Sequence, residues 1–343
     1  MDTLNTRSSL PFGPRSVAIA FSLLCVFLLL PTAGADARLF KKTAVVMGTE
    51  FEVSLHASDK AKADAAFDAA LEEMVRIEGE MSEWMEGTPV YAINKSAGRA
   101  PVRVSAELYK VISAAQTVSA LSGGAFDISW ASMRGLWSFA EGAERLPSAK
   151  EVAERLPLVD YREVLLDDAK KSVFVRKVGA MIGLGAIAKG YGVDMAMKRI
   201  VKLGIKDALV RAGGDMRVQG TDNGRPWEVG IRHPREKQRH IAKLGLTNIS
   251  ISTSGDYERF FIKHGVLYHH IMDPKTGYPG VRSQSVTVLA PDTMTSDALS
   301  TALFVMGPAE GLALVGRLKG IEAIIIDASG KVHTSAGITI NNP

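Results

Sequence analysis

The order of helix-like and strand-like segments is the feature that most constrains the fold of this chain. The first half combines strand-like pieces with long helical patterns, and the second half is rich in short strands, with a hairpin signal around Lys263-His264-Gly265. These segments do not follow the repeating strand–helix–strand rhythm of a parallel α/β protein. Hairpins beside packed helices are typical of the α+β class, which we therefore predict.

Hydrophobic periodicity places the individual elements. Helices are expected at 60–81, 105–121, after Ser148, at 186–203, at 297–306 and at 309–318. The third begins with a capping-box signature, Ser148 followed by Glu151. Strands are expected at 43–46, 51–56, 208–211, 227–231, 249–253, 257–262, 266–271, 285–289 and 323–326. With 46% hydrophobic residues over 343 positions and no internal repeat, the sequence predicts one continuous globular unit.

The N-terminal segment has the pattern of a secretory signal. Arg7 and Arg15 precede an apolar run at 17–30, and small residues follow at 33–37. A membrane anchor needs about 18 or more apolar residues, and this run is shorter. We therefore predict that residues 1–37 are a signal peptide cleaved after Ala35 or Ala37, and that residues 38–343 are a periplasmic domain.

Cysteine and charge exclude several classes of function. Cys25 is the only cysteine and lies within the predicted signal, so the mature chain has no disulfide, thiolate nucleophile or cysteine-ligated metal. A net charge of +4 without clustered basic runs argues against nucleic acid as a partner. Any chemistry must use oxygen, nitrogen or a bound cofactor.

One glycine-rich segment admits three interpretations. Gly183-Leu184-Gly185-Ala186-Ile187-Ala188 matches G-x-G-x-x-A ahead of a predicted helix, which is the fingerprint of a Rossmann-type oxidoreductase. No clean acidic residue ends the next strand, however. Backbone N–H groups at a helix start, with Lys189 in the first turn, also suit a phosphate. The structural alternative is close packing of helix and strand through glycine.

A second helix start carries oxygen ligands. Asp297 and Thr301 have i, i+4 spacing and share one helix face, so a carboxylate and a hydroxyl can converge on a hard cation such as Mg²⁺. Alternatively, Asp297 is only a favourable first-turn charge and Thr301 packs. His269 and His270 are neighbours on a predicted strand and point to opposite faces, so at most one of them faces any given site.

Taken in order, short motifs along the chain resemble the ApbE family of FAD:protein FMN transferases. They are Met47-Gly48-Thr49, Asn94, Gly124-Ala125-Phe126-Asp127, Ala186-Ile187-Ala188-Lys189-Gly190, Ala212-Gly213-Gly214-Asp215, Thr253-Ser254-Gly255-Asp256-Tyr257, 270–277 with Pro279, and 297–303. Each motif is modest by itself, but the set in this order is highly specific and covers essentially the whole predicted mature chain.

The resemblance implies a fold and an activity. The fold is α+β and related to the T-fold, with mixed sheets and packed helices in two lobes around a flavin site. The activity is that of an exported enzyme that binds FAD and Mg²⁺, splits the pyrophosphate and joins FMN by a phosphoester to a Ser or Thr of an acceptor protein, releasing AMP. The acceptor is expected to be part of a membrane redox complex.

The resemblance also assigns residues by position. FAD contacts are expected from Met47, Trp84, Ala125, Phe126, Asp127, Lys189 and Ile271. Metal ligands are expected from the backbone carbonyl of Ala186 and from Asp297, Ser300 and Thr301. His270 is expected to help deprotonate the acceptor hydroxyl, and it forms the catalytic set with Lys189 and Asp297.

One position departs from the family pattern. The family usually carries an acid that contacts FAD ahead of its helix-start lysine, as in D-L-G-G-I-A-K-G, and Gly183 stands at that position here. We predict that Gly183→Asp tightens FAD binding, unless a positive φ or a close backbone approach requires glycine. A non-catalytic periplasmic FAD-binding protein of the same ancestry remains an alternative. The chain lacks a D-G-x-[ST]-G-A-[ST] stretch of the kind flavinylated in acceptors, which favours a modifying enzyme.

Overall fold

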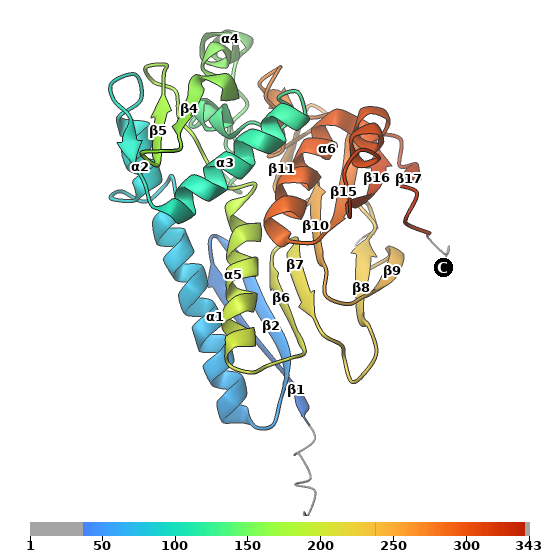
Figure 1. Ribbon diagram of the computed structural model, residues 1–343. Coiled ribbons are helices and arrows are strands. Elements are labelled where there is room, and N and C mark those ends of the chain that lie inside the picture. The colour runs from blue at the N-terminus through green and yellow to red at the C-terminus, as the bar shows by residue number, and fades with distance from the viewer. Residues whose placement is uncertain (1–36, 237, 340–343) are drawn as a thin grey trace, which may run out of the picture. The chain divides into compact units, whose positions relative to one another are not determined.

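An eight-stranded antiparallel sheet forms the centre of the computed structural model, which describes residues 37–236 and 238–339 (Figure 1). Its strands, in spatial order, are β1 (Arg38–Val46), β2 (Thr49–Ala57), β6 (Ala208–Ala212), β7 (Asp215–Gln219), β10 (Ser250–Gly255), β15 (Ser283–Ala290), β16 (Glu322–Asp327) and β17 (Val332–Thr334). Every neighbouring pair is antiparallel. The predicted signal run at 17–30 lies outside the described residues.

Smaller sheets surround the central one. They are a three-stranded sheet of β3 (Val102–Arg103), β5 (Ser172–Val175) and β4 (Val164–Asp167), and the pairs β8 (Trp227–Arg232) with β9 (His240–Leu246), β11 (Phe260–Lys263) with β12 (Val266–His269), and β13 (Met272–Asp273) with β14 (Tyr278–Pro279). The predicted hairpin is confirmed, because β11 and β12 pair across His264 and Gly265, both with positive φ.

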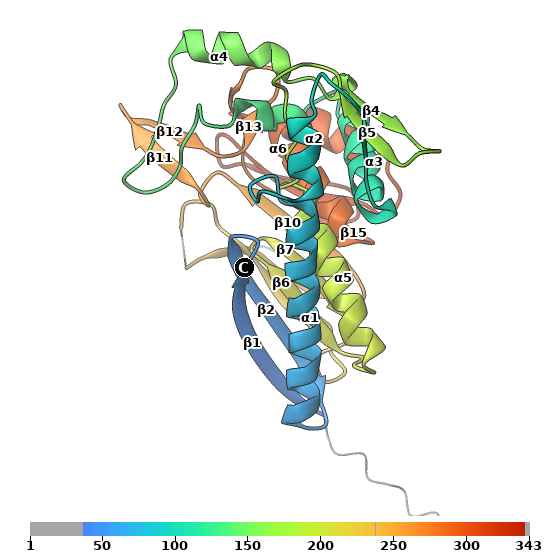
Figure 2. The same cartoon turned by 90° about the vertical axis from the view of Figure 1, so that its left-hand side faces the viewer.

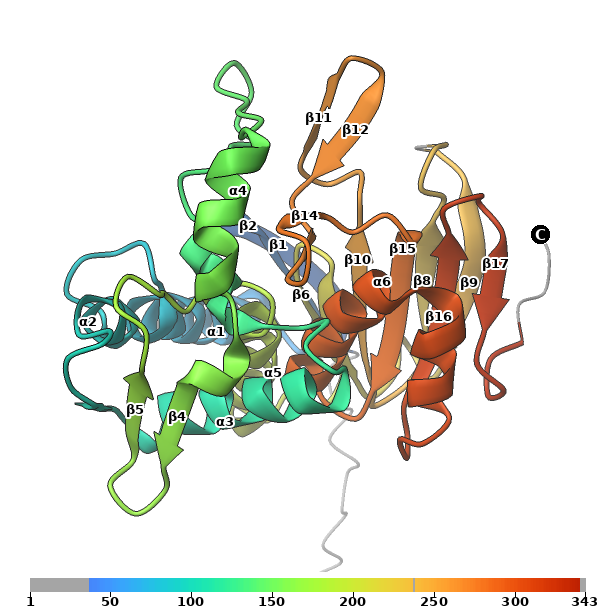
Figure 3. The same cartoon turned by 90° about the horizontal axis from the view of Figure 1, so that it is seen from above.

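Three long helices pack on the central sheet. α1 (Lys60–Met81) contacts β1 and β2, and α5 (Ala188–Lys202) lies beside it against β6 and β7 (Figure 2). α6 (Thr293–Val315) packs on β10, β15 and β16 (Figure 3). The other helices are α2 (Pro89–Lys95), α3 (Ala106–Leu121) and α4 (Ala149–Arg155), with 3₁₀ turns at Ile128–Met133, Leu156–Leu158 and Tyr161–Glu163. The α+β prediction is confirmed.

Helix α6 is broken where the sequence predicts a break. Two helices are predicted at 297–306 and 309–318, and the backbone between them is non-helical at Gly307, where φ is 76°, directly before Pro308. The first of the two begins earlier than predicted, at Thr293. Most of the apolar length of α6 is buried inside the protein, as expected of a core helix, although length and hydropathy alone would let it cross a membrane. Because α6 begins at Thr293, Asp297 lies in its second turn, which removes the interpretation of Asp297 as a first-turn charge.

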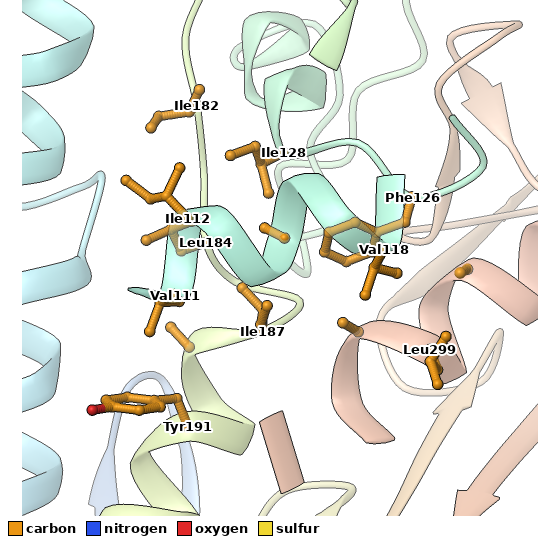
Figure 4. Packing of buried hydrophobic residues seen from close by; sticks show 14 of the residues in the cluster. Val111, Ile112, Val118, Phe126, Ile128, Ile182, Leu184, Ile187, Tyr191 and Leu299 are labelled. Atoms are coloured by element: carbon orange, nitrogen blue, oxygen red, sulfur yellow. The ribbon is translucent and has the colours of Figure 1, made fainter. Parts of the chain in front are cut away.

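The largest hydrophobic cluster fixes the segment that leads into α5. Ile182, Leu184 and Ile187 are fully buried and pack in the cluster that also holds residues of α3 and α6, such as Ile112 and Leu299 (Figure 4). The side chain of Asn94 pins the same segment by two hydrogen bonds with the backbone of Ile182, at 2.7 and 2.9 Å. The start of α5 is therefore held rigidly against the core.

Candidate functional site

Two tight turns bring several strand ends together. Met47 and Gly48 have φ of 52° and 67° and form the two-residue turn between β1 and β2. In the turn between β6 and β7, a Cβ on Gly213 would lie 2.8 Å from Oγ1 of Thr49, and a Cβ on Gly214 would lie 2.5 Å from the carbonyl oxygen of Thr253. Glycine is required at both positions because β2, β6 and β10 approach so closely there.

A buried charged cluster lies where these strand ends meet α5 and α6. The ammonium Nζ of Lys189, in the first turn of α5, is 2.7 Å from Oδ2 of Asp215 and 3.3 Å from Oδ2 of Asp297. Asp297 also accepts a hydrogen bond from the backbone N–H of Gly190, at 3.0 Å. Both carboxylates are buried. We call Lys189, Asp215 and Asp297 the charged cluster.

The charged cluster has more negative than positive charge. Burial and the neighbouring carboxylate of Asp215 raise the pKa of Asp297 to about 7, even though Lys189 opposes the shift. Burial lowers the pKa of Lys189, but the two carboxylates outweigh it and the net shift is upward. Two carboxylates share one ammonium, so the cluster favours an additional proton or cation.

The expected metal ligands fit a hard cation. Within residues 37–236 and 238–339, no three His, Cys, Asp or Glu side chains are grouped to hold a metal. A metal here must therefore use the carboxylate of Asp297 with neutral oxygens, the donors that Mg²⁺ prefers. Thr301 follows Asp297 by four residues in α6, and its Oγ1 is 3.4 Å from Oγ of Ser254. Ser300 is already engaged, since its Oγ bonds to the carbonyl oxygen of Asp297 at 2.9 Å and to Oγ of Ser254 at 2.8 Å.

The two neighbouring histidines have different surroundings. His269 is structural: its Nε2 is 2.8 Å from the carbonyl oxygen of Gly280, and its Nδ1 accepts from the N–H of Ile271. His270 has a buried Nδ1 without a hydrogen-bond partner in the described part of the chain. Burial, helped by nearby positive charges that include Lys189, lowers the pKa of His270 to about 4. Its imidazole is therefore neutral at physiological pH and has a free ring nitrogen.

Arg259 ties the histidine segment to the first turn. Its guanidinium Nη2 donates to the carbonyl oxygen of Gly48 at 3.0 Å, and its own carbonyl oxygen accepts from the N–H of His270 at 3.1 Å. This arrangement joins Met47, at the β1–β2 turn, to His270. The structure thus brings the predicted residues Lys189 and Asp297 into direct contact and holds His270 and Met47 on linked segments.

The remaining residues predicted to contact FAD fall into two groups. Trp84 is 67% exposed, and Met47 is half-buried where the segment meets α5. Ala125, Phe126 and Ile271 are buried in the main hydrophobic cluster. Asp127 caps the 3₁₀ turn that follows it: Oδ1 accepts from the N–H and hydroxyl of Ser129, and Oδ2 accepts from the N–H of Tyr161. Its hydrogen bonds thus hold this segment in shape. Ala186 precedes α5 and is half-buried.

Sequence reasoning did not assign a role to two acids, the buried Asp215 and the partly buried Asp194. Asp215 is part of a quoted motif, and only its contact with Lys189 reveals its role. Asp194 accepts hydrogen bonds from the N–H groups of Thr293 and Met294, so α5 caps the first turn of α6. Two sequence features could have identified these acids. Asp194 is a carboxylate on the inward-facing side of a predicted helix, and Asp215 is an acid directly after a Gly-Gly turn.

The Rossmann interpretation of the glycine segment is not supported. β5 ends at Val175, so no strand leads directly into the segment, and the central sheet is antiparallel. Gly190 is the glycine that allows close packing, because a Cβ there would lie 2.3 Å from the carbonyl oxygen of Thr293. Its role is helix-to-helix approach between α5 and α6.

Comparison with known proteins adds independent information. Residues 47–325 match the model of the ApbE family. The chain is 32% identical over 306 residues to the FAD:protein FMN transferase of Klebsiella pneumoniae (strain 342), covering 88% of this chain and 93% of that protein. It is 32% identical over 338 residues to the enzyme of the same name from Treponema pallidum (strain Nichols), covering 92% of each. The crystal structure of the ApbE protein of Thermotoga maritima superposes with a TM-score of 0.80 at 36% identity, covering 88% and 98%.

Proposed function

The chain belongs to the ApbE family, and from this we propose that it is an Mg²⁺-dependent FAD:protein FMN transferase. It moves FMN from FAD to a Ser or Thr hydroxyl of an acceptor protein and releases AMP. The observation that carries the proposal is the charged cluster of Lys189, Asp215 and Asp297, with the neutral His270 within its electrostatic reach.

The transfer exchanges one phosphorus–oxygen bond for another. The acceptor hydroxyl oxygen bonds to the phosphorus on the FMN side of the pyrophosphate, and the bond from that phosphorus to the bridging oxygen breaks. AMP leaves with the bridging oxygen, and the hydroxyl proton passes to a base. Such a reaction depends mainly on positioning and on neutralising negative charge.

A cation held by Asp297 would supply the neutralisation together with Lys189. When bound, Mg²⁺ stabilises negative charge that develops on phosphoryl oxygens. Asp297 would hold it with Thr301 and the carbonyl of Ala186, with Ser300 as a further hydroxyl. Asp215 keeps Lys189 charged and fixed in the first turn of α5. Lys189 is then a permanent cation for a phosphate at this helix start.

His270 suits the role of base. A base must be unprotonated before the reaction, and the low pKa keeps the imidazole neutral at physiological pH. Nδ1 has no hydrogen-bond partner among the described residues, so a ring nitrogen is available to accept the hydroxyl proton. Positive charges nearby that lower this pKa also make the protonated form short-lived, which favours return of the proton to solvent.

The proposal includes a location and a partner. The signal-like N-terminus supports export to the periplasm, and the family resemblance supports an acceptor in a membrane redox complex. A non-catalytic FAD-binding protein is the competing function, and it would bind FAD without releasing AMP.

The test uses the chain without residues 1–37, FAD, Mg²⁺ and membranes that contain candidate acceptors. After denaturing electrophoresis, we expect flavin fluorescence on a protein band, a mass gain of one FMN on a Ser or Thr of that protein, and AMP in solution. A chelator should abolish all three. If FAD stays intact and bound, and no AMP is released with any of the acceptors tested, the result supports a non-catalytic FAD-binding protein and contradicts the transferase proposal.

A further inference from the structure

A carboxylate from another segment fills the space beside Gly183. A Cβ built on Gly183 would lie 2.8 Å from Oε1 of Glu83 and 3.0 Å from Cβ of Ala131. Gly183 is not among the residues with positive φ, so its backbone conformation does not require glycine. The carboxylate of Glu83 thus occupies the space that a side chain at position 183 would take.

Glu83 is a buried carboxyl that lies beside Arg134 without a hydrogen bond between their charged groups. The residue is 5% exposed, and burial raises the pKa of its carboxyl although Arg134 and nearby backbone N–H groups oppose the shift. The nearest guanidinium nitrogen, Nη2 of Arg134, is 3.8 Å from Oε1, which is beyond hydrogen-bond distance. The pair is thus an ion pair without a hydrogen bond between the charged groups.

Arg134 also has unused donors. Its Nη1 donates to the carbonyl oxygen of Glu83 at 3.0 Å, but Nε and Nη2 are buried and have no partner within the described ranges. Its guanidinium lies 3.8 Å from the ring centroid of Trp84, the exposed side chain predicted to contact FAD. Buried polar groups normally have partners. Two unpaired donors of Arg134 beside an exposed aromatic ring, with the carboxylate of Glu83 next to them, therefore point to a bound polar ligand.

We propose that Glu83 provides the carboxylate of the FAD site in this chain, in place of an acid at position 183, and that Arg134 and Trp84 complete this part of the site. This inference rests on the proposed function. With the acid at residue 83 instead of residue 183, a carboxylate lies at the same place in the site but belongs to a different segment of the chain. A glycine at 183 leaves room for this carboxylate, and the affinity for FAD is preserved.

A double-mutant cycle tests the exchange. The variants are Glu83→Ala, Gly183→Asp and the double variant, and the readout is the Kd for FAD from flavin fluorescence quenching with Mg²⁺ present. We expect Glu83→Ala to weaken binding about tenfold, the effect of losing one hydrogen bond to a charged group. Gly183→Asp alone should also weaken binding, because the new side chain collides with Glu83 and repels it. The double variant should bind within about threefold of wild type, since strongly coupled sites deviate from additivity.

A neighbouring glycine provides the matched control. Gly185 has nothing within 4 Å of its Cβ position, so Gly185→Asp adds the same charge to the same segment without contacting Glu83. In the Glu83→Ala background, Gly185→Asp should not restore FAD binding. Thermal unfolding of every variant separates loss of affinity from loss of fold, and Glu83→Gln keeps the side-chain volume where Glu83→Ala is unstable.

The outcomes separate this inference from the proposed function. A wild-type protein that does not bind FAD would reject the proposed function. A wild-type protein that binds FAD while Glu83→Ala and Glu83→Gln bind it equally well would overturn the role of Glu83 alone. Additive losses in the double variant, or equal rescue by Gly185→Asp, would also overturn it.

Discussion

Asp297 is the residue whose ionisation links stability, metal and pH. Its pKa is raised from 3.8 to about 7 in the folded protein, so between these values the folded state binds a proton that the unfolded state has released. Without metal, stability from this group is therefore lost as pH rises from about 4 to 7. Under the proposed function a divalent cation would replace the proton, so its stabilising effect should grow over the same range.

We predict that Mg²⁺ raises the Tm more at pH 8 than at pH 5.5. Thermal unfolding with and without Mg²⁺ at both pH values measures the effect. In Asp297→Asn, which has no ionisable group at this position, the Mg²⁺-induced shift should be small at both pH values. An equal shift for the wild-type protein at pH 5.5 and pH 8 would contradict the assignment of Asp297 as a metal ligand.

Asp297 and Thr301 should differ in their effect on catalysis. Asp297→Ala should reduce FMN transfer by ~100-fold or more, because loss of a charged metal ligand costs several kcal/mol of transition-state stabilisation. Thr301→Ala should be milder, since water replaces a neutral ligand. Rates of AMP release at increasing Mg²⁺ measure both variants. Wild-type rates for Asp297→Ala at ordinary Mg²⁺ concentrations would exclude the site.

Helices α5 and α6 depend on one glycine for their contact. A Cβ at position 190 would lie 2.3 Å from the carbonyl oxygen of Thr293 and 2.8 Å from Cβ of Asp297. We predict that Gly190→Ala destabilises the protein by about 1–3 kcal/mol, the usual cost of overpacking, and lowers transfer by separating Lys189 from Asp297. Denaturant unfolding measures the stability.

Gly185 is the control for this substitution. It precedes α5 in the same segment, and nothing lies within 4 Å of its Cβ position. Gly185→Ala should therefore leave the free energy of unfolding close to the wild-type value. If Gly190→Ala were as stable as Gly185→Ala, the close approach of α5 to α6 would be wrong.

Long helices with a clear hydrophobic period could be predicted from the sequence. Very short strands, and a helix start that is capped by a residue of another helix, could not. The range of α1 agrees with its expected range of 60–81, and the capping box of Ser148 and Glu151 is present. Two-residue strands such as β13 and β14 show no alternation, so nothing in the sequence marks them. The start of α6 was placed too late because part of its cap comes from Asp194 on another helix.

The candidate site follows the same division. Motifs identified Lys189 and Asp297 because each has a recognisable position at or near a helix start. Asp215 and Glu83 could not be assigned, since their roles arise from contacts between distant segments. The sequence alone predicts that Gly183→Asp tightens FAD binding. Our further inference predicts weaker binding instead, because the carboxylate of Glu83 already lies in the space beside Gly183, a contact that the sequence does not show.

At the scale of the whole molecule, the first 35 or 37 residues should be absent from the working protein. A positively charged start, a short apolar run and small residues predict cleavage after Ala35 or Ala37. Intact-mass analysis of the periplasmic fraction should give a chain that begins at Asp36 or Arg38. Full-length protein retained in the membrane fraction would show an N-terminal anchor instead.

The balance of products tests the assignment of the whole molecule as a transferase. FAD, Mg²⁺ and a purified acceptor are incubated with the wild-type chain, and AMP and covalently bound FMN are counted in the same sample. We predict one AMP for each FMN attached to a Ser or Thr of the acceptor, and at least ~100-fold less of both products with Asp297→Ala. AMP without protein-bound FMN would indicate hydrolysis of FAD, and intact FAD would indicate binding alone; either result would contradict flavin transfer.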